Sequence, residues 1–146
     1  MSLRFGAYPQ HMATTPTDAL TKAALSETER RVLSRIVALL KAEFGGDLLA
    51  VWLYGSRARG ERTHPDSDVD LLVIARGDTH RNQRVAGDLG EAAALADGES
   101  PFAYSVHVYD PQWLRGRREI ESFFIQEVDR DKIVLAGSDL EGGDAP

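Results

Sequence analysis

A short segment after an apolar run carries residues that suit phosphate binding. Residues 54–60 read YGSRARG. Gly55 permits a tight turn, and we expect a short helix to begin near Ser56, with its first N–H groups exposed as an anion site. The Ser56 hydroxyl adds a donor, and Arg57 and Arg59 add positive charge suited to phosphate. These four residues are therefore predicted to hold the phosphates of a nucleotide.

Two carboxylates follow in the next apolar segment. Residues 66–73 read DSDVDLLV. Asp68 and Asp70 are two positions apart in a predicted strand, so both side chains point to one face. Two like charges on one face repel unless a cation or protons neutralise them. Oxygen ligands favour Mg²⁺, with Mn²⁺ as an alternative, and such ions assist phosphoryl chemistry. Asp68 and Asp70 are therefore our candidate metal ligands and catalytic residues.

Hydrophobic patterning predicts the elements that position these residues. Helical spacing and a Ser26 cap indicate a helix that ends at Gly45, and a second helix begins at Asp78 or Thr79 and runs to about Asp97. Further helical segments begin at Pro111 and surround Phe123 and Phe124. The predicted strands are Leu48–Tyr54, Val69–Ala75, Phe102–Tyr109 and Ile133–Leu135.

The order of these elements predicts an α+β (α/β-like) domain. We expect a short mixed sheet of four to five strands, covered by helices on one side, with the acids on its open face or in a cleft at its edge. The domain is predicted to span residues 25–137. Residues 1–24 are Pro/Thr-rich without periodicity and are expected to form a disordered tail, and residues 138–146 a frayed one.

Composition narrows the functional class. The 146 residues are 42% hydrophobic and 27% charged, which is typical of a globular domain, and no cysteine is present. No apolar run approaches about 18 residues, and no secretory signal is evident, so we expect a cytoplasmic protein without a membrane span. The net charge of -6 disfavours a general nucleic-acid-binding role. Neither a P-loop motif nor a strand-linked G-x-G-x-x-G is present.

Residues 51–75 resemble a known family signature. The pattern G-S-x-x-x-G followed by S-D-x-D is that of the polymerase β-type nucleotidyltransferases, and the chain is most similar to their small stand-alone prokaryotic (minimal) members. The resemblance implies a nucleotidyltransferase fold, phosphate binding by Gly55 and Ser56, and Mg²⁺ binding by Asp68 and Asp70. It also implies transfer of a nucleoside monophosphate, AMP from ATP or another nucleoside triphosphate, to an acceptor hydroxyl.

The chain departs from this family at one position. Active members usually carry a third carboxylate on a later strand, and the strand Phe102–Tyr109 contains no Asp or Glu. Ser105 occupies the corresponding position, and alternation places His107 on the same face. Two hypotheses follow. The first is an active enzyme, and the second is a weak or inactive nucleotide-binding, antitoxin-like module that acts through residues 111–128.

The acceptor and the partners are open at this stage. A protein side chain, a small molecule or an RNA end could receive the nucleotide, although nucleic acid is not favoured. Small members of the family act as antitoxins that pair with helical toxins, so the resemblance implies a helical protein partner. A homo-oligomer is a further alternative.

Overall fold

A mixed four-stranded sheet forms the centre of the described structure. The computed structural model describes residues 20–61 and 68–141. The strands are β1 (Leu48–Tyr54), β2 (Val69–Ala75), β3 (Tyr104–Tyr109) and β4 (Ile133–Gly137), in the spatial order β3-β2-β1-β4. β1 runs antiparallel to β2 and to β4, and β2 runs parallel to β3. This confirms the predicted α+β fold with a short mixed sheet.

Four helices surround the sheet in the described part of the chain. They are α2 (Glu27–Phe44), α3 (Thr79–Ala96), α4 (Pro111–Glu119) and α5 (Phe123–Asp131). Short 3-10 turns occupy η2 (Leu20–Lys22), η3 (Gly45–Asp47) and η4 (Pro101–Ala103). Because η4 takes up residues 101–103, β3 begins two residues later than predicted. No helix among these residues has the length and apolar character needed to cross a membrane.

Side-chain caps explain where the helices begin. The Ser26 hydroxyl accepts a hydrogen bond from the Glu29 N–H, and the Glu29 carboxylate accepts one from the Ser26 N–H, which together form a capping box for α2. A side-chain oxygen of Asp78, Asp110 and Ser122 likewise accepts a hydrogen bond from a backbone N–H in the first turn of α3, α4 and α5, respectively. The predicted starts of the first two helices and of the segment at Pro111 are therefore confirmed.

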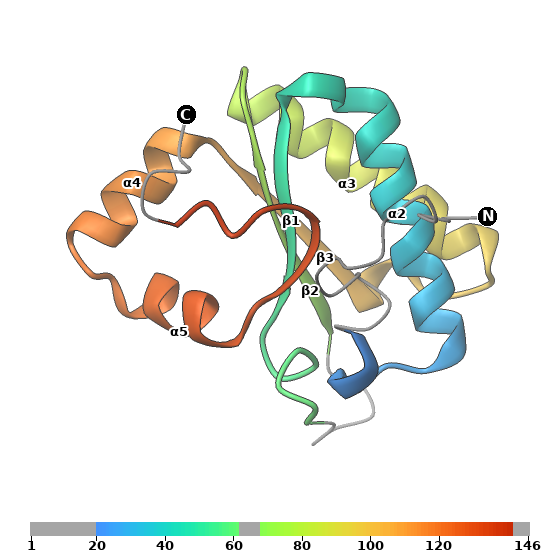
Figure 1. The fold of residues 1–146 in the computed structure, drawn as a ribbon. Coiled ribbons are helices and arrows are strands. Elements are labelled where there is room, and N and C mark those ends of the chain that lie inside the picture. Colours follow the sequence, from blue (N-terminus) through green and yellow to red (C-terminus); the bar gives the residue numbers. More distant parts are fainter. Residues whose placement is uncertain (1–19, 62–67, 142–146) are drawn as a thin grey trace, which may run out of the picture.

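Helices cover both faces of the sheet, so the expectation of a single covered side is wrong. Figure 1 shows α2 and α3 on one side and α4 and α5 on the other. The alternation of each strand requires this arrangement. Val51, Leu53, Leu71 and Val73 are buried towards α2 and α3, whereas Trp52, Leu72 and Ile74 are buried in a second cluster with residues of α4 and α5. Both faces are apolar, and each needs a cover.

The folded part extends beyond the predicted limits of 25 and 137. Ala23 is buried in the first core, and the η2 carbonyl of Leu20 accepts a hydrogen bond from Arg30. At the other end, Leu140 is buried in the second core, and its carbonyl accepts a hydrogen bond from Arg118. Residues 20–24 and 138–141 therefore belong to the domain, while residues 1–19 and 142–146 lie outside the described residues.

A side chain covers the outer edge of β3. The Gln83 amide of α3 donates to the Val106 carbonyl at 2.8 Å, and its oxygen accepts from the Val108 N–H at 2.8 Å. An edge strand otherwise presents unpaired backbone groups. The single amide group satisfies one donor and one acceptor of this edge.

Candidate functional site

The Gly-Ser turn (residues 55–60) and the aspartate pair lie at the same edge of the sheet. β1 ends where β2 begins, because the two strands are antiparallel and Tyr54 pairs with Asp70. Gly55 has φ +82°, and a Cβ placed on it would lie 3.0 Å from Asp70 Oδ2. Glycine is thus required both for the backbone angle and for the close approach of the carboxylate. The sequence prediction placed the turn and the acids together, and in the structure Gly55 lies beside Asp70.

Residues 55–60 form a single helical turn, so the prediction of a short helix that begins near Ser56 is wrong. The Gly55 carbonyl accepts hydrogen bonds from the N–H groups of Ala58 (3.1 Å) and Arg59 (3.2 Å). Gly60, at φ +84°, then turns the chain away. Among the described residues, neither the N–H nor the hydroxyl of Ser56 has a hydrogen-bond partner. We therefore keep both Ser56 donors as candidates for ligand contact.

Arg57 lies away from the expected phosphate position. Its side chain is 2% exposed, and Nη1 donates to Glu29 Oε1 at 2.9 Å and to the Ala24 carbonyl at 3.1 Å. The backbones of these two segments are joined as well, because the Ala24 N–H donates a hydrogen bond to the Arg57 carbonyl. Arg57 therefore fastens the Gly-Ser turn to the start of α2.

Arg59 lies closer to solvent and beside the turn. Its guanidinium pairs with Glu61 and with Asp131, each at 3.3 Å, and its side chain is 35% exposed. Arg59 also lines a cavity together with Gly55. Its charge therefore lies at the turn, as predicted, although it is shared with two carboxylates.

The electrostatics of Asp70 fit a cation. Burial raises the pKa of Asp70, and the neighbouring Asp68 carboxylate raises it further, while His107 and Arg57 act in the opposite direction. A divalent cation would relieve this repulsion, so the pair is suited to Mg²⁺ or Mn²⁺. Within residues 20–61 and 68–141, however, no group of three His, Asp or Glu side chains is arranged to hold a metal.

β3 places Ser105 next to the aspartates. In the parallel pairing of β2 with β3, Ser105 lies beside Asp70 and His107 lies beside Leu72. Ser105 is half-buried and His107 is exposed. β3 itself contains no carboxylate. Asp110 lies at the opposite end of β3, where its carboxylate caps α4 by accepting from the Trp113 N–H at 2.8 Å. It therefore does not supply the missing acid.

A small cavity beside the turn was missed by sequence reasoning. It measures about 190 Å³ and is bounded by the end of β1, the Gly-Ser turn and α5; its lining residues are Tyr54, Gly55, Arg59, Phe124, Glu127 and Val128. Burial and the charge of Asp70 raise the pKa of Tyr54 to about 12, so its phenol stays protonated at neutral pH. The adjacent phenylalanines 123 and 124 were the available signal, but the sequence did not separate a core role from an interface role.

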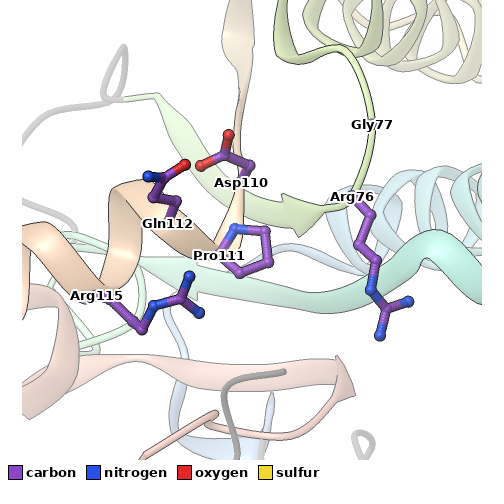
Figure 2. Close-up of a pocket in the computed structure, with 6 residues that line it drawn as sticks. All are labelled: Arg76, Gly77, Asp110, Pro111, Gln112 and Arg115. Carbon is purple, nitrogen blue, oxygen red and sulfur yellow. The ribbon is translucent and has the colours of Figure 1, made fainter.

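A second cavity lies far from the aspartates. Figure 2 shows it at the other end of the sheet, where β2 and β3 end; its lining residues are Arg76, Gly77, Asp110, Pro111, Gln112 and Arg115. Its volume is about 340 Å³. Six residues of extended chain separate Arg76 from Asp70, a distance of roughly 20 Å. This larger cavity is therefore separate from the site at the Gly-Ser turn.

Comparison with known proteins supplies a family. The model of the nucleotidyltransferase domain family matches residues 33–134, which include the turn, both aspartates and β3. A search of curated proteins finds no significant match. The match to the family confirms the resemblance seen in residues 51–75.

Two solved structures are distantly similar to this chain. One is a toxin–antitoxin complex with AMP-PNP, at 22% identity, a TM-score of 0.45, and coverage of 70% of this chain and 72% of the other. Another is the tri-AMPylated HEPN toxin of Shewanella oneidensis in complex with MNT antitoxin, at 18% identity, a TM-score of 0.44, and coverage of 78% and 76%. The family assignment therefore depends on the family match.

Proposed function

Because the chain belongs to the nucleotidyltransferase domain family, we propose that the Gly-Ser turn and the aspartate pair form the site of a nucleotidyl transfer. The donor is ATP or another nucleoside triphosphate, and the acceptor is a hydroxyl group. The observation that carries this proposal is how near the turn lies to the acid, since a Cβ added to Gly55 would lie 3.0 Å from Asp70 Oδ2. A phosphate-binding turn and a cation-binding carboxylate thus share one small volume.

Each side chain has a defined role in this proposal. The N–H and hydroxyl of Ser56 donate to phosphate oxygens, and Arg59 adds positive charge beside the turn. Asp68 and Asp70 hold the divalent ion, which when bound neutralises negative charge on the phosphates. Arg57 is left out of the phosphate contacts, because its guanidinium is buried against Glu29.

The reaction itself exchanges one bond to the α-phosphorus for another. The acceptor oxygen forms a bond to this phosphorus, the bond to the bridging oxygen breaks, and pyrophosphate leaves with its electron pair. The acceptor hydroxyl must lose its proton. His107 presents an imidazole on the face that carries Asp70, whereas the Ser105 hydroxyl is a poor base, so we assign the proton to His107.

A transfer assay does not require the acceptor to be identified first. The protein is incubated with ATP and Mg²⁺, alone and with the product of any neighbouring gene, and each protein is examined by mass spectrometry for added AMP. We expect transfer that is lost in Asp68→Ala. Asp88→Asn removes an exposed charge on α3 and serves as the control that retains activity. Transfer that survives in Asp68→Ala would contradict the proposed metal-binding role.

The second candidate is a nucleotide-binding module without appreciable transfer. The lack of a carboxylate on β3 favours it, because loss of a general base alone costs roughly 10²–10⁴ in rate. Such a module would act by contact through α4 and α5, where Ile120 and Phe123 are 67% and 75% exposed. ATP binding without transfer to any tested acceptor would support this reading. A helical protein partner and a homo-oligomer stay predictions for either candidate.

A further inference from the structure

We propose that Phe124 forms a stacking platform for the base of the nucleoside triphosphate whose phosphates are held at the Gly-Ser turn. This inference rests on the proposed function, which does not say how the base of the nucleotide is bound. Phe124 lies in the first turn of α5, and its side chain is 41% exposed. It lines the same cavity of about 190 Å³ as Gly55, so a base on this ring and phosphates at the turn can belong to one ligand.

The Phe124 ring is already fixed in place. It packs edge to face on Tyr54, with 5.6 Å between ring centroids and an interplanar angle of 89°, and lies 6.5 Å from the Trp113 ring at 64°. Trp113 is in turn stacked on Tyr109 at 3.7 Å. An aromatic ring that is held by its neighbours loses little freedom when a ligand stacks on it. A large exposed apolar ring held this rigidly beside a polar turn is suited to a planar ligand.

The size of the cavity fits a base alone. Pockets that enclose a whole drug-sized ligand measure roughly 300–1,000 Å³, and this one is smaller. The phosphates would therefore lie outside it, at the Ser56 donors. Every base offers a π-face, so stacking by itself does not distinguish the polar groups at the edges of the bases. It favours the larger purine rings only through their size.

A carboxylate at the rim adds a preference among bases. Glu127 lines the cavity one helical turn after Phe124 and is half-buried. An ionised carboxylate only accepts hydrogen bonds. It can therefore accept from the exocyclic amino group of adenine, guanine or cytosine, whereas uracil has no such group. With the preference of stacking for large rings, this predicts amino-bearing purine nucleotides over UTP.

The neighbouring residue provides a matched control. Phe123 is 75% exposed and does not line the cavity. Replacing either phenylalanine with alanine removes the same side chain from the same turn of α5. Only Phe124→Ala removes the proposed platform, and Phe124→Leu keeps an apolar side chain against Tyr54 while removing the flat ring.

The experiment compares ATP with inorganic tripolyphosphate, which has the phosphates and no base. Affinities are measured by isothermal titration calorimetry in Mg²⁺ for the full chain. Stacking on an aromatic ring corresponds to a factor of about 10 in affinity. We expect the wild type to bind ATP about 10-fold more tightly than tripolyphosphate and more tightly than UTP. Phe124→Ala and Phe124→Leu should lose most of that advantage with unchanged tripolyphosphate affinity, and Phe123→Ala should bind both ligands as the wild type does.

The possible failures are distinguishable. If ATP and tripolyphosphate both bind and Phe124→Ala leaves the ATP affinity unchanged, the base platform is wrong and the phosphate site stands. The same conclusion follows if Phe123→Ala weakens ATP binding as much as Phe124→Ala does. If the folded wild type binds neither ligand, the proposed function fails, and the base platform fails with it.

Discussion

Replacement of Arg57 with methionine tests whether this residue supports the turn or contacts phosphate. The guanidinium is 2% exposed and donates to Glu29 Oε1 at 2.9 Å, and the Glu29 side chain is itself only 12% exposed. The same Glu29 oxygen accepts from the Ser26 N–H at 2.8 Å in the capping box of α2. Methionine keeps most of the volume and removes the charge, so the Glu29 carboxylate loses this buried cation.

The expected loss is large for a domain of this size. Removal of one partner of a buried ion pair costs about 3–5 kcal/mol, because the other charge stays in the interior. Small domains have a free energy of unfolding of about 5–15 kcal/mol, so the variant should fold but unfold at a much lower urea concentration. The double variant Arg57→Met/Glu29→Met should lose less than the sum of the single losses, because no unpaired charge remains.

Urea unfolding followed by tryptophan fluorescence measures this loss, since Trp52 is fully buried in the wild type. Arg59→Met is the matched control. Arg59 is two residues further on and pairs with Glu61 and Asp131 near the surface, so its loss should cost less than about 1 kcal/mol. ATP affinity is measured on each variant where it is folded.

One result would refute this account of Arg57. If Arg57→Met unfolds at the wild-type urea concentration but loses affinity for both ATP and tripolyphosphate, the guanidinium acts on the ligand rather than on α2. The side chain would then have to leave Glu29 when the nucleotide binds.

Three other positions give testable expectations. Gly55→Ala should lower the free energy of unfolding by about 1–2 kcal/mol, because the left-handed backbone at this position disfavours a Cβ. It should also weaken ATP binding, because that Cβ would crowd Asp70. Wild-type values in both assays would contradict the close approach of Gly55 and Asp70. Asp70→Asn should abolish Mg²⁺-dependent transfer but raise the free energy of unfolding at pH 7 by about 1 kcal/mol, because burial and a like charge raise the pKa of Asp70. This gain should shrink as the pH falls through that pKa. A variant less stable than the wild type at pH 7 would refute this prediction. Burial opposes ionisation of Asp129, but hydrogen bonds from Arg118 and Lys132 lower its pKa overall. Its contribution to stability is therefore present above the unfolded-state pKa and is lost as the pH falls through the folded-state pKa. Urea unfolding between pH 7 and pH 2 should show a smaller loss of stability in acid for Asp129→Asn than for the wild type.

The parts of the fold that depend on local pattern could be read from the sequence. The strands at residues 48–54 and 69–75 have the predicted limits, because each is an apolar run, broken in the second only by Asp70, with polar residues or glycine at its ends. The helix that begins after Ser26 has its predicted cap, because the hydroxyl and Glu29 are close in sequence. The spacing of Asp68 and Asp70 predicts a common face, and this stays a prediction.

The remaining features depend on contacts between distant residues. Nothing near Arg57 in the sequence indicates that its partner is Glu29, 28 positions earlier. The segment at Leu140 is bonded to Arg118 of α4, which lies 22 positions earlier. The covering of the second sheet face and the cavity at Phe124 both arise from how α4 and α5 pack, and short helical segments give little indication of the face on which they will lie.

The Gln83 amide at the rim of β3 limits the ways in which another polypeptide can approach. An extended peptide that joined the sheet there would have to displace two hydrogen bonds, both 2.8 Å long. β-Augmentation and strand-exchanged dimers through this margin are therefore disfavoured. A macromolecular partner of the proposed transfer would therefore approach by a surface other than the outer edge of β3.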